Sequence, residues 1–247
     1  SFPTRRSSDL LGRAGVRIAC AGKSAADIAG IADHGLHVEL LVRNNAVCVH
    51  RDGASRQTGD RRRAVDRDDP LDDFQRRTIS LLGHDRLVYI MGSGPAVIVM
   101  TEMPGISPHV ARFARWVRDA GFTVYMPSLF GRDGAVPKVR EGIVVFKRAC
   151  VSAEFRALAA NESSPVTDWL RALARLAHGE CGGPGVGAVG MCFTGNFALT
   201  MMLEPAMLAP VVCQPSLPLN EPAGINMSTS ELAGVKARLD RDNLSVL

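Results

Sequence analysis

The residues most suited to chemistry lie between Gly190 and Gly195, where a cysteine stands in a short glycine-flanked stretch. The apolar segment Val186–Val189 precedes this stretch, and the helix-like segment Asn196–Leu203 follows it. A sharp turn between a strand and a helix is the setting of a nucleophile elbow, which presents the side chain at its apex to substrate. Cys192 is therefore the candidate nucleophile, with a thiol in place of the usual hydroxyl.

The two glycines of the stretch support this interpretation. A Cβ atom at Gly190 or Gly195 is expected to collide with the neighbouring strand or helix. The turn would also put Cys192 at a helix N-terminus, where backbone N–H groups and the helix dipole favour a thiolate. The alternative is an inert core cysteine, since free cysteines are often buried. The strand before the turn and the helix after it favour the catalytic interpretation.

Composition excludes several classes of protein. The chain has 247 residues, enough for one large domain or two small ones, and 46% of them are hydrophobic. A net charge of +4 gives no support for nucleic-acid binding. The six cysteines form no C-x-x-C pair, which fits reduced thiols in a cytoplasmic protein. We find no membrane-spanning segment, signal peptide, metal-ligand cluster or nucleotide-binding motif, so we expect no membrane association, metal or cofactor.

The chain divides into three parts of different character. Residues 1–10 resemble a translated sequencing adaptor, or alternatively a disordered arm. Residues 11–69 are poorly defined and run into an Arg/Asp-rich segment, 51–77, with eight arginines and seven aspartates. Such balanced charge indicates a solvated linker, or translation from upstream of the true start. We expect residues 70–247 to form the folded domain.

Apolar strands and amphipathic helices alternate in that domain. Ala96–Met100 is continuously apolar, as expected for a parallel strand covered on both faces. Ser107 and Pro108 predict the start of a helix that ends near Gly121. Further strands are predicted at His37–Val42, Tyr89–Met91, Phe122–Met126, Val186–Gly190 and Ala209–Cys213, and one more begins at Ser245. Further helices are predicted at Val151–Ala160, Val166–Ala177, Asn196–Leu203 and Glu231–Leu239. Thr229 or Ser230 is expected to cap the last of these helices. This alternation predicts an α/β fold with a mostly parallel sheet.

Two blocks of sequence resemble the dienelactone hydrolase family, a cysteine branch of the α/β-hydrolases. The first block joins Val97–Ile106 to Gly121–Gly131, and it resembles the family's strand, glutamate loop, helix and next strand. The second block is the Gly190–Gly195 elbow, in which Met191 stands where the family usually has Tyr. The resemblance covers residues 70–247 and implies an α/β-hydrolase fold with helices on both faces of the sheet.

The resemblance also assigns roles. It implies that Cys192 is the nucleophile and that Glu102 meets the resting thiol and helps to form the thiolate when substrate arrives. The oxyanion hole would consist of the backbone N–H groups of Met103 and Phe193. The implied activity is carboxylic ester or lactone hydrolysis on a small molecule, without a cofactor. A monomer is the expected state of the intact domain.

The chain departs from the family after the elbow. In α/β-hydrolases an acid and then a histidine follow the nucleophile, but all six histidines of this chain precede Cys192. The aspartates beyond the elbow, Asp240 and Asp242, lie on or just after the last predicted helix. We therefore expect a C-terminally truncated, impaired hydrolase that lacks the catalytic Asp and His. His109 is near the expected site but reads as a surface residue, and His178 fits a helix C-terminus.

Other functions remain open from the residues alone. Glutamine amidotransferases and the related DJ-1-like proteins also carry cysteine in such elbows, although the glutamate loop favours the hydrolase. A binding protein that keeps the fold without the chemistry is the non-enzymatic alternative. Arg140, Arg148 and Arg156 are candidates to meet a substrate carboxylate, although surface solvation also explains each of them.

Overall fold

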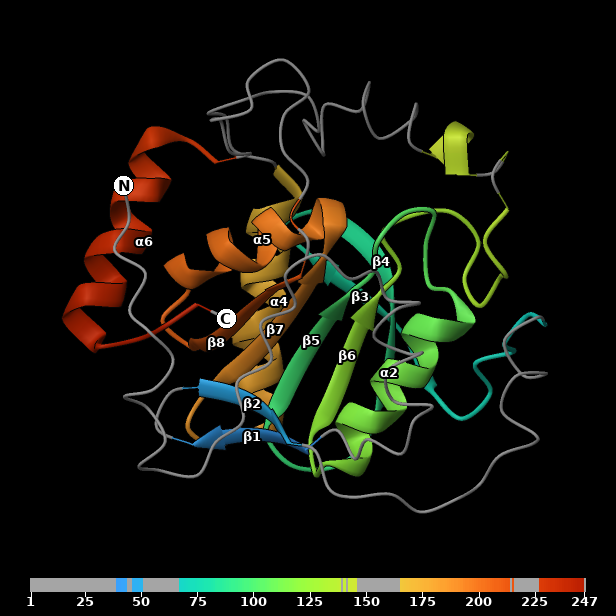
Figure 1. The fold of residues 1–247 in the computed structure, drawn as a ribbon, viewed down its shortest axis with the longest axis horizontal. Helices are drawn as coiled ribbons and strands as arrows, with labels where there is room; N and C mark the ends of the chain where they lie inside the picture. The colour runs from blue at the N-terminus through green and yellow to red at the C-terminus, as the bar shows by residue number, and fades with distance from the viewer. Residues whose placement is uncertain are drawn as a thin grey trace.

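A six-stranded sheet forms the centre of the molecule (Figure 1). The computed structural model describes residues 39–43, 46–50, 67–138, 140, 142–145, 165–213, 215 and 227–246. The strands of the central sheet are β3 (Gln75–Leu81), β4 (His84–Met91), β5 (Ala96–Met100), β6 (Thr123–Pro127), β7 (Val186–Met191) and β8 (Met207–Cys213). A separate antiparallel pair joins β1 (Glu39–Arg43) to β2 (Ala46–His50).

The strand order of the central sheet is β3-β4-β6-β5-β7-β8. β5 pairs in parallel with β6 and β7, and β7 pairs in parallel with β8. β4 is antiparallel to both of its neighbours, β3 and β6. The predicted mostly parallel α/β sheet is therefore confirmed. The carboxyl ends of β5, β6, β7 and β8 meet at one edge, which is where open α/β sheets bind their ligands.

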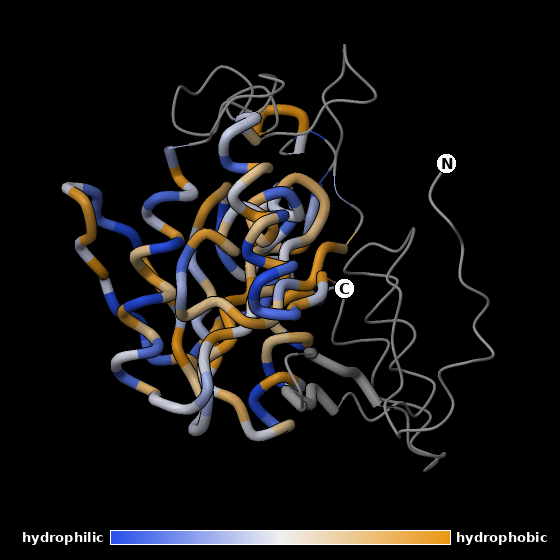
Figure 2. The backbone as a smooth tube through the Cα atoms, turned by 90° about the vertical axis from the view of Figure 1, so that its left-hand side faces the viewer, coloured by the Kyte–Doolittle hydropathy of each residue, from blue (hydrophilic) through white to orange (hydrophobic). Residues whose placement is uncertain are grey.

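Alternate side chains of β5 enter two different hydrophobic cores. Ile98 and Met100 belong to the core that also contains buried residues of α4, α5 and α6, whereas Val97 and Val99 belong to the core under α2. Every residue of β5 is buried, which explains its uninterrupted apolar sequence. Figure 2 shows that hydrophobic and hydrophilic segments alternate along the folded part of the backbone.

Helices cover both faces of the sheet, as predicted (Figure 1). α2 (Pro108–Asp119) lies on one face, and the Ser107 hydroxyl caps it by accepting the Val110 N–H at 3.3 Å. α4 (Pro165–Cys181), α5 (Gly195–Thr200) and α6 (Thr229–Asp242) lie on the other face. A short 3₁₀ segment, η2 (Met201–Leu203), continues α5.

The edge strand β3 was not predicted from the sequence. Its residues are mostly exposed or partly exposed, and Ile79 is its single fully buried side chain. Such a strand lacks the apolar run or strict alternation that a sequence pattern requires. It closes one edge of the sheet by antiparallel pairing with β4.

The C-terminal predictions need two corrections. α6 is capped by Ser228, not by Thr229 or Ser230: the Ser228 hydroxyl accepts the Glu231 N–H, and the Glu231 carboxylate accepts the Ser228 N–H, each at 3.2 Å. No strand begins at Ser245 in the described residues. Instead, Asn243 adopts a left-handed conformation that ends α6, and Leu244 turns back into the core.

Part of the Arg/Asp-rich segment belongs to the folded unit. Arg115 of α2 donates to both carboxylate oxygens of Asp69, at 2.6 and 2.9 Å, and to those of Asp73, at 2.7 Å each. The Asp68 carboxylate accepts the Val136 N–H at 2.9 Å. Side chains that read as solvated in the sequence thus fasten residues 68–73 to α2 and to the loop after β6. The helix predicted at Val151–Ala160 and residues 1–38 lie outside the described residues.

Candidate active site

Cys192 occupies the sharp turn between β7 and the helical segment that follows it. It is the first residue of the 3₁₀ turn η1 (Cys192–Thr194), which leads directly into α5. Its φ of 54° lies in the left-handed region, which costs a residue other than glycine about 1–3 kcal/mol. Strain of this kind at the end of a central strand is characteristic of a nucleophile elbow.

The expected close packing is present at both elbow glycines. A Cβ atom on Gly190 would overlap the carbonyl oxygen of Thr194, which belongs to the turn itself. A Cβ atom on Gly195 would lie 3.0 Å from the Cα atom of Pro215, beyond the end of β8. Gly190 therefore allows the turn to fold back on its strand, and Gly195 allows α5 to approach the next strand connection.

The Cys192 thiol is half-buried, and its pKa lies above the ordinary value. Burial is the main cause, and the negative charge of Glu102 acts in the same direction. A hydrogen bond from the backbone N–H of Phe193 opposes both effects without cancelling them. The turn thus supplies the expected N–H group that favours a thiolate, but burial and the Glu102 charge outweigh it, so the net shift of the Cys192 pKa is upward.

Glu102 and Met103 lie on the loop that follows β5, and both are partly buried. The Gly105 N–H donates to the Glu102 carbonyl at 3.1 Å, which closes the loop into a turn. A Cβ atom on Gly105 would lie 2.5 Å from the carbonyl oxygen of Phe130, so this loop packs backbone to backbone on the loop after β6. The two segments of the first sequence block, Val97–Ile106 and Gly121–Gly131, are thus in direct contact.

Thr194 was not singled out in the sequence, although it holds the fifth position of the elbow, where a Gly-x-Cys-x-Gly pattern has glycine. Its hydroxyl accepts the Met191 N–H at 2.8 Å and lies 3.2 Å from the Thr101 carbonyl. The side chain is completely buried. The spacing of the two glycines, Gly-x-Cys-x-x-Gly, was the available signal, because it leaves Thr194 at the fifth position.

Aromatic contacts also join the elbow to the loop after β6. The ring of Phe193 meets the ring of Phe130 edge-on, with centroids 5.9 Å apart. On its other side it meets Phe197 of α5, with centroids 5.1 Å apart. Such edge-to-face pairs stabilise by about 0.5–1.5 kcal/mol beyond the burial of their area. Phe193 is therefore held firmly at the position that follows Cys192.

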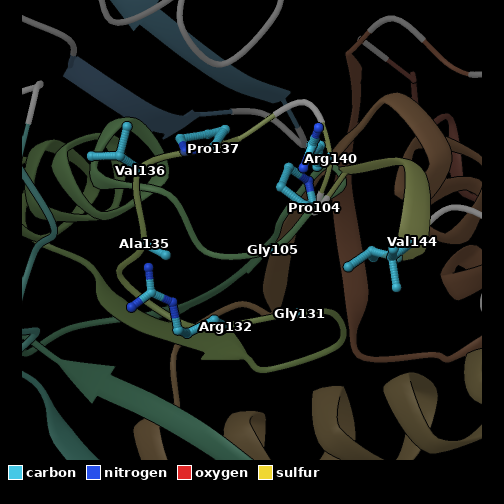
Figure 3. A pocket seen from close by; sticks show the side chains of 10 residues that line it. Pro104, Gly105, Gly131, Arg132, Ala135, Val136, Pro137, Arg140 and Val144 are labelled. Carbon is cyan, nitrogen blue, oxygen red and sulfur yellow. The ribbon is translucent and has the colours of Figure 1, made fainter.

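A pocket of about 410 Å³ opens beside the Glu102 loop (Figure 3). Its walls come from the loop after β5, the loop after β6 and the segment that follows. Two arginines, Arg132 and Arg140, line it together with Pro104, Gly105, Gly131, Ala135, Val136, Pro137, Val144 and Val145. Of the three arginines considered for a substrate carboxylate, Arg140 is therefore at this pocket, whereas Arg148 and Arg156 lie outside the described residues.

The loop that carries Arg132 is held by a half-buried carboxylate that the sequence analysis did not single out. Asp133 accepts hydrogen bonds from the Ser128 hydroxyl at 3.0 Å and from the Tyr89 hydroxyl at 3.1 Å. Burial raises the pKa of Asp133, and burial together with the Asp133 charge raises the pKa of Tyr89 to about 12. No spacing in the sequence links these three residues.

Sequence comparison places this chain in a known family. The sequence model of the dienelactone hydrolase family matches residues 87–229, more than half of the chain, and this range contains Glu102, Met103 and the whole elbow. The chain belongs to the dienelactone hydrolase family. The resemblance noted in the sequence is thereby confirmed, and so is the α/β-hydrolase fold.

Several solved structures are similar to this family member. A proposed dienelactone hydrolase from Klebsiella pneumoniae subsp. pneumoniae MGH 78578 is 16% identical over 70% of this chain and 82% of its own, with a TM-score of 0.46. A protein named m3DLH is 20% identical over 71% and 80% of the two chains, with a TM-score of 0.43. A search of curated proteins found no match.

Two histidines of this dienelactone hydrolase family member lie near the ends of helices. His109 is in the first turn of α2 and is partly buried. His178 is in the last turn of α4, where a ring nitrogen lies 3.2 Å from the Gly183 carbonyl. Because α4 leads into the start of β7 and Cys192 follows its end, His178 is at the opposite edge of the sheet from the thiol.

Of the aspartates after the elbow, Asp242 belongs to a structural network and Asp240 is exposed. Asp242, at the end of α6, accepts hydrogen bonds from Arg241 and from Arg238. Arg238 is itself buried and donates to the main-chain carbonyls of Met202, Glu204, Pro205 and Met207. This network fixes α6 to the segment after α5. Among the described residues, no cluster of three or more His, Cys, Asp or Glu could hold a metal, and no helix is long and apolar enough to span a membrane.

Proposed function

We propose that this chain hydrolyses small carboxylic esters or lactones with Cys192 as the nucleophile. The observation that carries the proposal is the position of Cys192: a strained elbow at the carboxyl end of β7, with Glu102 of the adjacent β5 loop close enough to affect its thiol. Membership of the dienelactone hydrolase family supports the same chemistry. The two groups are the pair that covalent catalysis needs, a nucleophile and a neighbouring base.

The first half of the reaction would form a thioester. The Cys192 thiol gives its proton to the Glu102 carboxylate, and the sulfur attacks the carbonyl carbon of the substrate. A carbon–sulfur bond forms, and the carbonyl electron pair moves to oxygen. When this pair returns, the bond to the ester oxygen breaks, and the leaving oxygen takes the proton that Glu102 had received from the thiol. In a lactone the leaving group stays attached, so the ring opens without release of a fragment.

The oxyanion of this step would be stabilised by two backbone N–H groups. Phe193 follows the nucleophile, and its N–H already faces the Cys192 sulfur. Met103 lies on the Glu102 loop, next to the proposed base. Removing one donor of an oxyanion hole costs about 2.7–4 kcal/mol of transition-state stabilisation. Held by Phe130 and Phe197, Phe193 meets the requirement that such donors be fixed before the reaction.

The second half of the reaction requires a base that activates water against the thioester. In this sequence no histidine follows Cys192, and His178 lies at the far edge of the sheet. We therefore expect the 247-residue chain to form the thioester faster than it hydrolyses it. An early burst of the leaving alcohol, followed by slow turnover, is the kinetic pattern of this imbalance.

The pocket beside the Glu102 loop is the proposed site of the substrate's acyl portion. It combines apolar side chains with the guanidinium groups of Arg132 and Arg140. An ester or lactone that also bears a carboxylate would match this lining, because guanidinium groups bind carboxylates through paired hydrogen bonds. A neutral ester of the same size provides the comparison.

The test uses the purified full chain with p-nitrophenyl acetate and with an unsaturated lactone that carries a carboxylate. We expect wild type to release product and to show a mass increase of one acyl group on Cys192. Cys192→Ser is expected to lose at least about a hundredfold in rate. Cys181→Ser is the control, since Cys181 is a partly buried free thiol at the end of α4.

Two outcomes would favour the other functions. Release of ammonia from glutamine, with no ester turnover, would favour a glutaminase. Equal reactivity of Cys192 and Cys181 toward a thiol probe, with neither ester nor glutamine turnover, would favour a binding protein without chemistry. Either result would overturn the hydrolase proposal.

A further inference from the structure

Two buried threonines connect the elbow to the loop that carries Glu102. Thr194 lies in the elbow and Thr101 directly follows β5, and neither side chain is exposed to solvent. β5 and β7 are neighbours in the sheet, with Met100 opposite Gly190. Polar side chains buried at this depth are retained when each hydrogen-bonding group has a partner.

The Thr194 hydroxyl bridges the two strand ends. It accepts the Met191 N–H at 2.8 Å, and its single proton can go to the carbonyl of Met191 at 3.0 Å, Thr101 at 3.2 Å or Met100 at 3.4 Å. Two of these carbonyls belong to the end of β5 and one to the elbow. The hydroxyl therefore sits between the elbow and the start of the Glu102 loop.

The Thr101 hydroxyl closes the Glu102 loop. It lies 2.5 Å from the Gly105 carbonyl and 2.9 Å from the Glu102 carbonyl, and its one proton serves either of them. The Gly105 N–H donates to the same Glu102 carbonyl. The Thr101 hydroxyl thus holds the Glu102 loop closed, while the Thr101 carbonyl is one of the three acceptors within reach of the Thr194 hydroxyl.

We propose that Thr194 and Thr101 are positioning residues, which fix the elbow with Cys192 and Phe193 against the loop with Glu102 and Met103. The inference rests on the proposed function, because it concerns the relative placement of its nucleophile, base and oxyanion donors. A glycine at the fifth elbow position would leave the Met191 N–H without this acceptor. In this chain, the side chains of Thr194 and Thr101 contribute to the link between the elbow and the Glu102 loop.

The placement of the elbow relative to the Glu102 loop matters because backbone donors from both act on one oxygen atom of the substrate. An oxyanion between the N–H groups of Phe193 and Met103 requires both donors at hydrogen-bond distance together. A displacement of about 1 Å in such a site can reduce the rate by about a hundredfold. Neither threonine side chain reaches the surface, so the role we assign is positioning, not contact with substrate.

The test replaces each hydroxyl by a methyl group. Thr194→Val and Thr101→Val are each expected to lower kcat for p-nitrophenyl acetate by about tenfold to a hundredfold with little change in KM. Thr194→Ser, which keeps the hydroxyl, should restore most of the rate. Because both hydroxyls act in one network, the double variant should lose less than the product of the two single losses.

The matched control is Thr200→Val in α5. Thr200 is also fully buried, but its hydroxyl donates to the Phe197 carbonyl at 2.9 Å within the same helix. We expect Thr200→Val to lower thermal stability about as much as Thr194→Val while leaving kcat near wild type. If all the valine variants lose stability to the same extent and none loses kcat, the threonines are structural only and the proposal is wrong.

A second readout does not depend on ester turnover. The pH dependence of Cys192 alkylation by iodoacetamide should move to higher pH in Thr194→Val, because the Phe193 N–H that favours the thiolate is no longer held. It should move to lower pH in Thr101→Val, because the Glu102 charge is no longer held beside the sulfur. If the alkylation profiles of the two variants move in opposite directions but the wild type hydrolyses no ester, the positioning role is supported and the hydrolase proposal is rejected. Unchanged profiles with normal turnover would reject the positioning role alone.

Discussion

The Glu102 carboxylate lies close enough to Cys192 for its negative charge to raise the pKa of the thiol. The Glu102 carboxylate thus has two opposite effects on the proton of the Cys192 thiol. At rest its charge disfavours the thiolate, which slows alkylation and oxidation of the sulfur. In the proposed reaction it accepts that same proton when the sulfur attacks. The two roles can be separated by experiment, because one is seen with a thiol probe and the other with a substrate.

We predict that Glu102→Gln makes Cys192 more reactive and the enzyme less active. Loss of the negative charge lowers the thiol pKa, so alkylation by iodoacetamide at pH 7.5 should become several-fold faster. Loss of the base should lower ester turnover by about a hundredfold or more. The measurements are the alkylation rate of the Cys192 peptide by mass spectrometry and the steady-state rate with p-nitrophenyl acetate.

The control for this variant is Asp240→Asn, an equivalent exchange of carboxylate for amide at an exposed position of α6. It should change neither measurement. Ester turnover that survives Glu102→Gln unchanged would remove Glu102 from the proposed mechanism. Slower alkylation would show instead that its charge does not act on the sulfur.

A second prediction concerns the pH dependence of the wild-type thiol. The Cys192 pKa is raised, mainly by burial, so the thiolate fraction at pH 7 is smaller than that of an ordinary cysteine. The alkylation rate should therefore increase with pH and should still be increasing above pH 9. An alkylation midpoint near pH 7 would contradict the raised pKa. Unfolding the chain in urea returns the thiol to ordinary surroundings and supplies the reference midpoint.

The sequence predicted the main parts of the fold because its signals there are local. Ala96–Met100 was predicted with the bounds it has, since a strand buried on both faces is apolar at every position. The start of α2 followed from Ser107 and Pro108, which act within one turn of helix. The elbow was recognised because strand, turn and helix are consecutive in the chain. Each of these features depends on neighbours in sequence.

Features that depend on distant contacts were missed. Thr194 matters because the end of β5 lies beside it, and Thr101 is 93 positions away in the chain. Tyr89 and Asp133 meet only because β4 pairs with β6. The raised thiol pKa could not be predicted for the same reason. The helix end is visible in the sequence, whereas burial and the nearness of Glu102 arise from the fold.

A third prediction compares two glycines. Gly190→Ala should disrupt the elbow, because the added Cβ would overlap the Thr194 carbonyl within the turn. We expect a loss of soluble protein, or a marked fall in thermal stability together with altered Cys192 reactivity. Gly179→Ala in α4 is the control, since a Cβ there meets nothing within 4 Å. Alanine in a helix is about 0.5–1 kcal/mol more favourable than glycine, so this variant should be slightly more stable.

A fourth prediction concerns acid stability. Arg115 donates to the carboxylates of Asp69 and Asp73, and these bonds hold both aspartate pKa values below the ordinary range, although burial of Asp69 opposes the effect. A lowered carboxylate pKa stabilises the folded state at pH values above the unfolded pKa of about 3.9, and this stabilisation is lost as pH falls through the folded values. Stability should therefore decrease below about pH 4.

Arg115→Met should lower the free energy of unfolding at neutral pH and should also weaken its dependence on pH below about pH 4. At pH 7 we expect the free energy of unfolding, measured with urea, to fall by about 1–3 kcal/mol, because hydrogen bonds between charged groups are lost. At pH 2.5 both carboxylates are largely protonated, so the difference between variant and wild type should shrink. Arg241→Met is the control, since the exposed Arg241–Asp242 pair should contribute little at either pH. A loss for Arg115→Met that is equal at pH 7 and pH 2.5 would mean that Arg115 stabilises through its contact with the Phe74 ring, not through its charge pairs.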